Sequence, residues 1–397
     1  MKRFVSTRCL AVVLLFSVTA SSTTMAGVGD GADRDYESRL VMAADRVVSG
    51  DWVAALDTID QLKRDFPLSR IAHLLHADLL SALAGKSDFG SADAAIADLR
   101  QQLQLRWRHT KTAVDTTIRP VPAKLLQVSD AVPFVLYVDL PSSRLYLFAQ
   151  QNDQLVRLSD YYITIGRAGF GKEREGDLKT PVGVYHVDGY IPGGELHARY
   201  GAGALTTDYP NTLDRFLNRT GFGIWLHGTE PGWMNRGPRA SEGCITLSNA
   251  DFERLATQLG SHRDVPIVID DDPDWIPVQK LRQMKHDIIN SITASAGHSV
   301  ETLSSDHHET SANGHALNES TFITDLVLYP GKEERLLTRS MASEDPTDTM
   351  AIERYWHRDA DGKWQVTLQT SVPLRAPEKL TADTVTPSNS TLESLGD

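Results

Sequence analysis

The chain has 397 residues, of which 41% are hydrophobic and 23% are charged, and its formal net charge is −12. This length leaves room for two or three domains, and the composition is ordinary for a globular protein. The acidic balance argues against general binding to nucleic acid, which requires a basic surface. We therefore expect a folded, multidomain protein with no nucleic-acid partner.

The first 26 residues have the pattern of a secretory signal peptide. Three basic residues, Lys2, Arg3 and Arg8, precede an apolar stretch over residues 10–20. Small residues then occupy the outer positions of a cleavage site at 24–26. The apolar stretch is too short to span a bilayer, and no later segment is long and apolar enough to be a membrane helix. We expect cleavage after residue 26 and a soluble mature protein in the periplasm or cell envelope.

Cleavage of that segment would leave one cysteine. Of the two in the sequence, Cys9 lies within the signal peptide and Cys244 lies in the mature chain. A single cysteine cannot form an internal disulfide, so Cys244 is either a buried bystander or a reactive thiol.

Residues 33–120 are predicted to form a helical domain. Apolar residues recur at three- and four-residue steps over 51–62, a second helix is expected over 71–79, and a third over 91–107. The paired helices resemble one tetratricopeptide-type unit. Because such repeats normally stack, a helical packing or dimerisation domain is the better interpretation, and either would offer the chain a protein partner or a means of self-association.

After a Pro-Val-Pro stretch at 120–122, interpreted as a linker, the apolar period changes to two. Strands are predicted at 134–139, 144–149, 161–165, 183–187, 224–226 and 265–269. One helix is expected over 251–259, with Asn249 as its N-cap. The glycine-rich segment 189–220 is expected to be a long loop, and we hypothesise that it closes over a substrate.

The C-terminal third is predicted to contain a helix over 284–292, a flexible polar linker over 293–320, and a small β or α+β module over 321–375. The turn at 359–362 is typical of a hairpin. The linker contains three histidines that could bind a metal, His307, His308 and His315. No carboxylate-supported ligand spacing accompanies them, so a solvated linker is the better interpretation. The fold class is therefore multidomain α+β, with a helical N-terminal domain and a mainly β centre.

The most informative segment is 224–247, which reads IWLHGTEPGWMNRGPRASEGCITL. An apolar strand ends at His227, and a loop rich in Gly and Pro leads to Cys244. An imidazole near a thiol can accept its proton and generate the nucleophilic thiolate. Gly243 allows the backbone to approach a substrate closely, and the amides of Gly243 and Cys244 are candidates for an oxyanion hole. Taken singly, such a histidine or cysteine is usually structural; together, they favour a nucleophile and its base.

These residues resemble the signature of L,D-transpeptidases of the YkuD type, in which His-Gly is followed by Ser-x-Gly-Cys. Further stretches resemble the same family over roughly 133–271: KTPVGVY at 179–185, Tyr209-Pro210-Asn211, Asp214-Arg215 and Thr220-Gly221. The resemblance implies that Cys244 is the nucleophile, that His227 is the general base, and that the backbone at Gly228 orients the base. It implies that Ser241 shapes the pocket.

Two positions depart from the family pattern. Glu242 stands where the family often has histidine, and Thr246 stands where many members have Arg or Asn. Both departures concern the specificity for the acceptor. Arg215, Arg236 and Arg239 are candidates to meet substrate carboxylates, and their alternative is the solvated surface.

The resemblance implies attack by Cys244 on peptidoglycan stem peptides, with a thioester intermediate and no metal or organic cofactor. A diaminopimelate amine as acceptor would make a transpeptidase, and water would make an L,D-carboxypeptidase or a related hydrolase. The three-part layout is similar to that of cell-shape-determining L,D-carboxypeptidases, whose C-terminal domain resembles nuclear transport factor 2. Two rivals are a non-catalytic wall-binding scaffold, which predicts a degraded motif, and a papain-like protease, which places its cysteine before its histidine.

Overall fold

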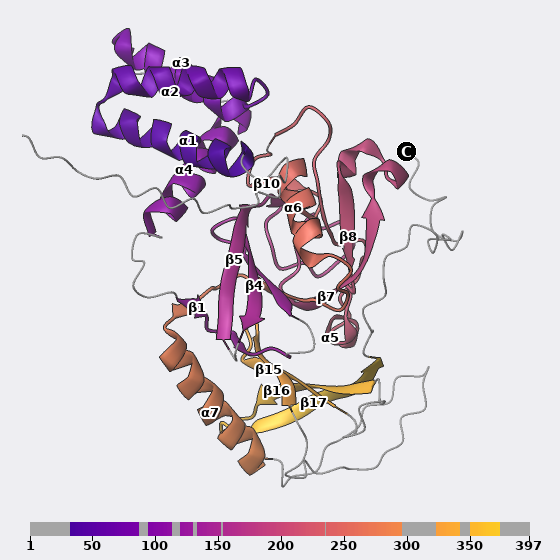
Figure 1. Ribbon diagram of the computed structural model, residues 1–397. Coiled ribbons are helices and arrows are strands. Elements are labelled where there is room, and N and C mark those ends of the chain that lie inside the picture. The colour runs from indigo at the N-terminus through magenta and orange to yellow at the C-terminus, as the bar shows by residue number, and fades with distance from the viewer. Residues whose placement is uncertain are drawn as a thin grey trace, which may run out of the picture.

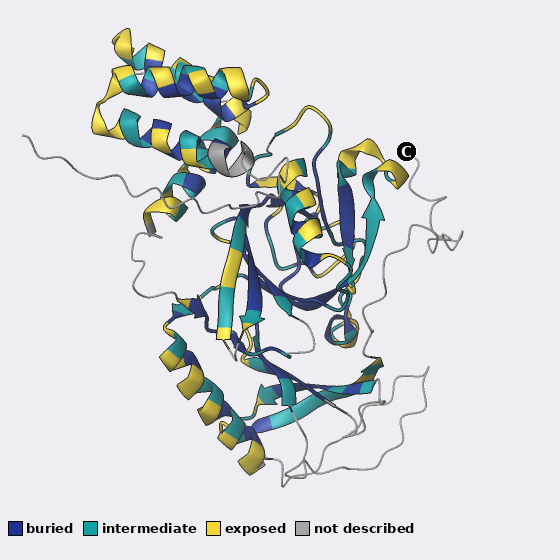
Figure 2. Ribbon diagram, in the orientation of Figure 1, coloured by how far each residue is buried: buried dark blue, intermediate teal, exposed yellow. Residues whose placement is uncertain are grey.

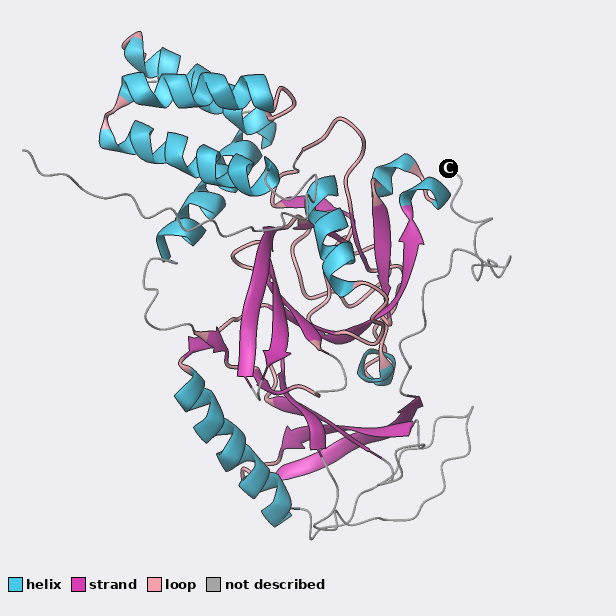
Figure 3. Cartoon of the chain, in the orientation of Figure 1, coloured by secondary structure: helices cyan, strands magenta, loops and turns pink. Residues whose placement is uncertain are grey.

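The structure is a computed structural model that describes residues 32–86, 94–112, 120–129, 133–151, 154–234, 236–295, 323–341 and 350–373. A group of helices, a central mainly β domain and a smaller C-terminal sheet follow one another along the chain (Figures 1 and 3). This arrangement confirms the predicted multidomain α+β class. The segment predicted to be a signal peptide, the linker histidines and the chain after 373 lie outside the described residues.

The helical part contains four helices in the described ranges: α1 (Ala32–Ser49), α2 (Trp52–Asp65), α3 (Arg70–Leu83) and α4 (Ala94–Thr112). Asp51 and Ser69 cap α2 and α3, because each side chain accepts a hydrogen bond from a first-turn amide. The apolar faces meet in one core, which includes Leu40, Ile59, Leu62, Ile71 and Leu75.

The central domain is built on an eight-stranded sheet with the order β11-β9-β8-β7-β12-β3-β4-β5. Its strands are mostly buried (Figure 2), and their bounds are β3 (Phe134–Asp139), β4 (Arg144–Gln151), β5 (Gln154–Tyr162), β7 (Gly183–Pro192), β8 (Gly203–Thr207), β9 (Trp225–His227), β11 (Ile245–Thr246) and β12 (Pro266–Asp270). A short parallel pair, β6 (Ile165–Gly166) and β10 (Arg239–Ser241), lies beside it. Helix α6 (Asn249–Leu259) contributes Phe252, Leu255 and Leu259 to the main core.

Several local expectations need correction. The strand predicted over 161–165 is broken, because β5 ends at Tyr162, Thr164 forms an isolated bridge with Thr246, and β6 begins at Ile165. The segment 189–220 is not a long loop, since β7 continues to Pro192 and is followed by two 3₁₀ turns, η1 (Gly193–Glu195) and η2 (Ala198–Tyr200), by β8 and by α5 (Thr212–Phe216).

The cap of α6 and the Pro-Val-Pro stretch also differ from expectation. Ser248, rather than Asn249, caps α6, because the Ser248 hydroxyl accepts from the amide of Asp251. Asn249 is the first helical residue, which frees its side chain for other contacts. The stretch at 120–122 is not a simple linker: β1 (Val121–Pro122) pairs with β13 (Trp275–Ile276).

The C-terminal module is a five-stranded antiparallel sheet with the order β17-β16-β15-β14-β2. Its outermost strand, β2 (Leu125–Gln127), precedes the central domain, and the others follow it: β14 (Ile323–Tyr329), β15 (Arg335–Met341), β16 (Met350–Arg358) and β17 (Trp364–Pro373). The hairpin turn predicted at 359–362 joins β16 to β17. Helix α7 (Val278–Ser295) is longer at both ends than expected and runs into the segment that we expected to be linker. No helix in the described part of the chain is long and apolar enough to cross a membrane.

A buried ionic cluster joins the helices to the central sheet. Glu37 of α1 accepts a hydrogen bond from Arg106 of α4 (2.8 Å) and another from Arg144 of β4. Arg144 also reaches Asp160 of β5 at 3.2 Å, and Asp160 is 2.9 Å from His109 of α4. Burial alone would raise the pKa of Glu37, but Arg106 and Arg144 hold it below its ordinary value. The cluster therefore fixes α1 and α4 against β4 and β5 by paired charges.

Candidate active site

Strand pairing brings the predicted histidine and cysteine together. β9 and β11 run parallel, with Ile245 opposite Leu226 and Thr246 opposite His227. Cys244 comes immediately before β11, so the loop that carries its thiol lies beside the strand that carries the imidazole. The pairing explains why a separation along the chain becomes proximity in the fold.

The imidazole of His227 is held in one orientation. Its Nδ1 donates to the backbone oxygen of Gly228 at 2.6 Å, as expected for Gly228. Because a carbonyl only accepts, Nδ1 carries the proton and Nε2 is left with its lone pair. Nε2 lies 3.4 Å from the hydroxyl of Thr246. Burial lowers the pKa of His227 to about 4, so the ring is neutral near pH 7 and can act as a base.

Cys244 is half-buried, and its thiol donates to the backbone oxygen of Gly223 at 3.2 Å. Burial raises the pKa of this thiol, against the opposing effect of the Trp225 amide, and the neighbouring Glu242 carboxylate raises it further. Near neutral pH the resting pair is therefore a neutral thiol and a neutral imidazole.

The loop before Cys244 is fixed by a short chain of hydrogen bonds. The hydroxyl of Ser241 donates to the backbone oxygen of Cys244 (2.6 Å) and accepts from the amide of Gly243 (3.1 Å). Gly243 has φ of +132°, and a Cβ there would lie 2.8 Å from the backbone oxygen of Lys179, so only glycine fits. The Gly243 amide is thus engaged, which differs from the expectation that it faces an oxyanion.

Thr180, within the KTPVGVY segment, ties this loop to its neighbour. Its buried hydroxyl donates to the backbone oxygen of Gly243 at 2.9 Å and accepts from the amide of Gly166 at 2.9 Å. Nothing in the spacing of the sequence indicated this role, although the resemblance drew attention to the segment.

Asn249 is a second tie that sequence reasoning missed. Its Oδ1 accepts from the amides of Ala202 (2.9 Å) and Thr229 (3.0 Å), which joins η2, the His227 strand and the start of α6. A Cβ on Gly228 would collide with this oxygen and lie 2.9 Å from the Ala202 nitrogen. Close packing therefore requires glycine at position 228, directly after His227.

Residues of η2 cover the histidine. The ring of Tyr200 is edge-on to His227, with centroids 5.0 Å apart, and it also contacts Trp225 at 5.2 Å. Burial, with a contribution from Cys244, raises the pKa of Tyr200. Its neighbour Arg199 and the more distant Arg167 flank Glu242. Sequence analysis proposed none of these three, since they belong to segments with no motif.

The three arginines that were expected to meet substrate carboxylates lie in different surroundings. Arg215 is bonded to Pro210 and Thr212 around its own short helix α5. Arg236 is held by Glu230 at 2.7 Å and lies within electrostatic range of His227. Arg239 is exposed on β10, beside Ser241. Arg236 and Arg239 therefore accompany the site, and Arg215 does not contact it.

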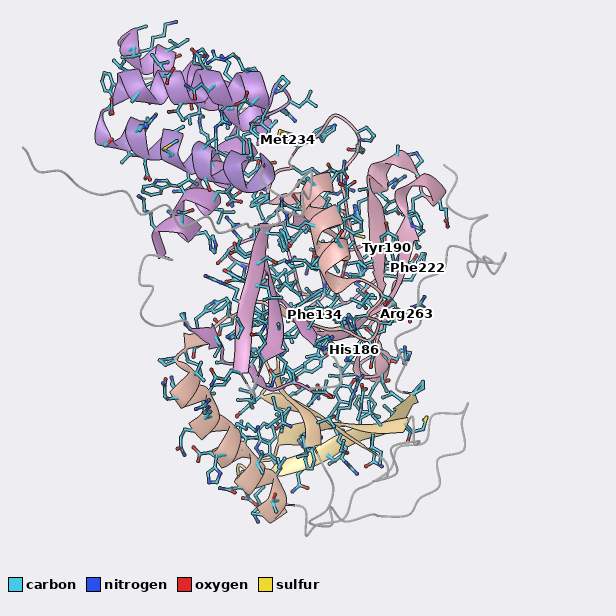
Figure 4. All side chains as sticks on the ribbon, viewed as in Figure 1. Phe134, His186, Tyr190, Phe222, Met234 and Arg263 are labelled. Carbon is cyan, nitrogen blue, oxygen red and sulfur yellow. The ribbon has the colours of Figure 1, made fainter. Side chains whose placement is uncertain are left out.

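The loop between His227 and β10 rests on the helical part of the chain. Met234 packs against the helical core and lies at its edge in Figure 4. Arg70 of α3 lies over the ring of Trp233, 5.1 Å from its centroid. The helices thus contact the loop that connects His227 to the segment before Cys244.

Residues 133–269 match the family model of the L,D-transpeptidase catalytic domain, YkuD. No curated protein matches the sequence. Among solved structures, Bd1075 of Bdellovibrio bacteriovorus is 21% identical with a TM-score of 0.50, over 64% of this chain and 99% of that one. The helical cell shape determining protein Pgp2 of Campylobacter jejuni is 17% identical with a TM-score of 0.43, over 68% of this chain and 100% of that one.

At these identities the structural likeness concerns the fold alone, so the family match carries the assignment. It covers the segment in which His227, at the end of β9, lies beside the loop that carries Cys244. Residues 133–269 therefore match a YkuD-type L,D-transpeptidase catalytic domain, and this match supports a peptidoglycan-modifying enzyme.

Proposed function

We propose that the protein is an exported, cysteine-dependent L,D-transpeptidase that acts on peptidoglycan stem peptides through a thioester on Cys244. The observation that supports this most directly is the orientation of His227. Its Nδ1 proton is committed to Gly228, which leaves Nε2 as the base beside the nucleophile loop. The assignment of peptidoglycan as the substrate rests on the family that residues 133–269 match.

The first half-reaction is acylation. As the thiol turns from the Gly223 oxygen toward His227, Nε2 takes its proton and Sγ attacks the carbonyl carbon at the L-centre of diaminopimelate. The C–N bond to the terminal D-alanine then breaks, and His227 returns the proton to the leaving amine. Burial disfavours a resting thiolate–imidazolium pair, so proton transfer and attack occur together. Because Ser241 holds the Gly243 amide, we assign the oxyanion contact to the amide of Cys244.

The second half-reaction is transfer of the acyl group. The side-chain amine of a diaminopimelate in another stem attacks the thioester, loses a proton to His227 and expels the thiolate, which is reprotonated. The product is a 3→3 cross-link. Thr246 is buried against His227, so it supports the base and leaves the choice of acceptor to exposed residues such as Glu242.

The alternative acceptor is water, which would make the protein an L,D-carboxypeptidase or a related hydrolase. The observation that favours it is the exposed Glu242 carboxylate two residues before the nucleophile, since a carboxylate can position water as well as an ammonium group. The intact cysteine–histidine arrangement counts against a non-catalytic scaffold.

A muropeptide assay on the mature chain, residues 27–397, separates these functions. Purified disaccharide-tetrapeptide is incubated with the wild type and with Cys244→Ala, and products are identified by chromatography and mass spectrometry. Cross-linked dimers that require Cys244 support the transpeptidase. Tripeptide without dimers supports the carboxypeptidase, and products that do not depend on Cys244 contradict both.

A further inference from the structure

Two arginines stand beside the nucleophile and have no part in the mechanism above. Arg167 follows β6, and Arg199 lies in η2. Their guanidinium nitrogens approach different oxygens of the Glu242 carboxylate, at 3.6 Å and 4.0 Å. All three side chains are more than half exposed. The group therefore faces solvent next to Cys244 and is accessible to a substrate.

The charges in this group do not balance. Two guanidinium groups face one carboxylate, which leaves one positive charge in excess on a chain whose net charge is −12. An anion is attracted to such a point more strongly than to the rest of an acidic surface.

Glu242 holds the arginines loosely. Strong guanidinium–carboxylate hydrogen bonds are about 2.7–2.9 Å long, and the nearby Arg236–Glu230 pair reaches 2.7 Å, whereas both contacts of Glu242 are longer. Exposed pairs of this kind contribute little to stability, because solvent and salt screen them. A second carboxylate can therefore replace Glu242 at small cost.

The position of the pair relates it to the reacting groups. The guanidinium of Arg199 lies 6.0 Å from the ring centroid of Tyr200, which is itself edge-on to His227. Glu242 lies close enough to Cys244 to raise the pKa of the thiol. Arg199 likewise adds to the electrostatic environment of His227.

We propose that Arg167 and Arg199 form an anion subsite that binds a carboxylate of the acyl-donor peptide, and that Glu242 occupies this subsite until the donor displaces it. The inference rests on the proposed function, which supplies the donor. Of the free carboxylates of the donor, the two on the residues that flank the scissile bond are the candidates: the C-terminal carboxylate of the leaving D-alanine and the D-centre carboxylate of diaminopimelate. Displacement of Glu242 also removes a negative charge from the neighbourhood of the sulfur, which favours the thiolate once the donor is bound.

Binding to the mature chain with Cys244→Ala tests the subsite without turnover. Isothermal titration compares the disaccharide-tetrapeptide with two analogues, one amidated at the C-terminus and one amidated at the D-centre of diaminopimelate. A hydrogen bond to a charged group contributes about 1.5–3 kcal/mol, so we expect the analogue that lacks the bound carboxylate to bind about tenfold to a hundredfold more weakly. The weaker analogue identifies the source of the carboxylate.

Variants in the same background locate the effect. In the double variant Arg167→Gln/Arg199→Gln, the free peptide should bind as weakly as the decisive analogue, and amidation should no longer matter. Glu242→Gln should tighten binding of the free peptide several-fold. Arg64→Gln, which removes an exposed arginine from α2, is the charge-matched control and should leave Kd unchanged.

The proposal is overturned if the free peptide shows no measurable binding, if both analogues bind as tightly as it does, or if the double variant behaves like Arg64→Gln. Product formation by the chain with Cys244 intact is measured separately from binding. Selective binding without Cys244-dependent products would contradict the proposed function alone, whereas turnover that ignores both amidations would contradict the subsite alone.

Discussion

Replacing Glu37 by alanine should destabilise the protein far more than an ordinary surface charge deletion. Glu37 pairs with Arg106 and Arg144, which are each only 2% exposed at the side chain, and is itself 24% exposed. Removal of one partner from a buried ion pair costs about 3–5 kcal/mol, because the other charge stays buried. Asp160 still pairs with Arg144, so we expect a loss of about 3 kcal/mol, at the lower end of that range.

The matched control is Asp65→Asn. Asp65 pairs with Arg39 of the same helix α1 at 2.7 Å, but its side chain is 56% exposed. Its removal should therefore cost less than about 1 kcal/mol. Urea unfolding, followed by far-ultraviolet circular dichroism, measures both losses through the shift of the midpoint.

The pH dependence gives an independent check. Because the pKa of Glu37 is lower in the folded protein than its ordinary value of 4.5, its stabilisation is present above pH 4.5 and is lost as the pH falls through the folded value. The difference between wild type and Glu37→Ala should therefore shrink in acid. Equal destabilisation by Glu37→Ala and Asp65→Asn at pH 7 would refute the reasoning.

Three further predictions concern the site. The acid limb of the kcat/KM profile should lie near pH 4, the pKa that burial gives His227, and a limb near 6.5 would contradict the neutral buried base. Gly228→Ala should reduce kcat by at least about tenfold because its Cβ displaces the carbonyl that orients the base, whereas Gly194→Ala, which meets open space, should not alter kcat in the same assay. Ser241→Ala, which loses two hydrogen bonds, should lower the free energy of unfolding by about 1–2 kcal/mol and reduce kcat more than it changes KM, as thermal melts and steady-state kinetics would show.

Local patterns in the sequence were sufficient for part of this picture. Apolar spacing predicted the helices near 52–65 and 70–83 and the hairpin over 134–149, because neighbouring residues determine those elements. The position of His227 at a strand end and that of Cys244 on a tight loop could be anticipated from the apolar pattern and the motif. These inferences needed no knowledge of distant contacts.

The remaining features depend on contacts between segments far apart in the chain. Arg199 and Tyr200 reach the site only because β8 pairs with β9 and brings η2 over the histidine. Asn249 was expected to cap a helix, and the real cap at Ser248 leaves its side chain to bridge two loops. The apolar periodicity of one segment does not indicate which distant residues its side chains will contact.

The pairing of β2 with β14 constrains the order in which the molecule can be completed. Gln127 donates to the backbone of Ile323, 196 residues later, so the catalytic domain is an insertion within the C-terminal module. During synthesis, β2 emerges before β14, from which the whole central domain separates it. Closing a loop over an unfolded chain of that length is entropically costly. A folded central domain that brings its two ends together removes much of this cost, so the completion of the five-stranded sheet is coupled to the folding of the domain inserted in it.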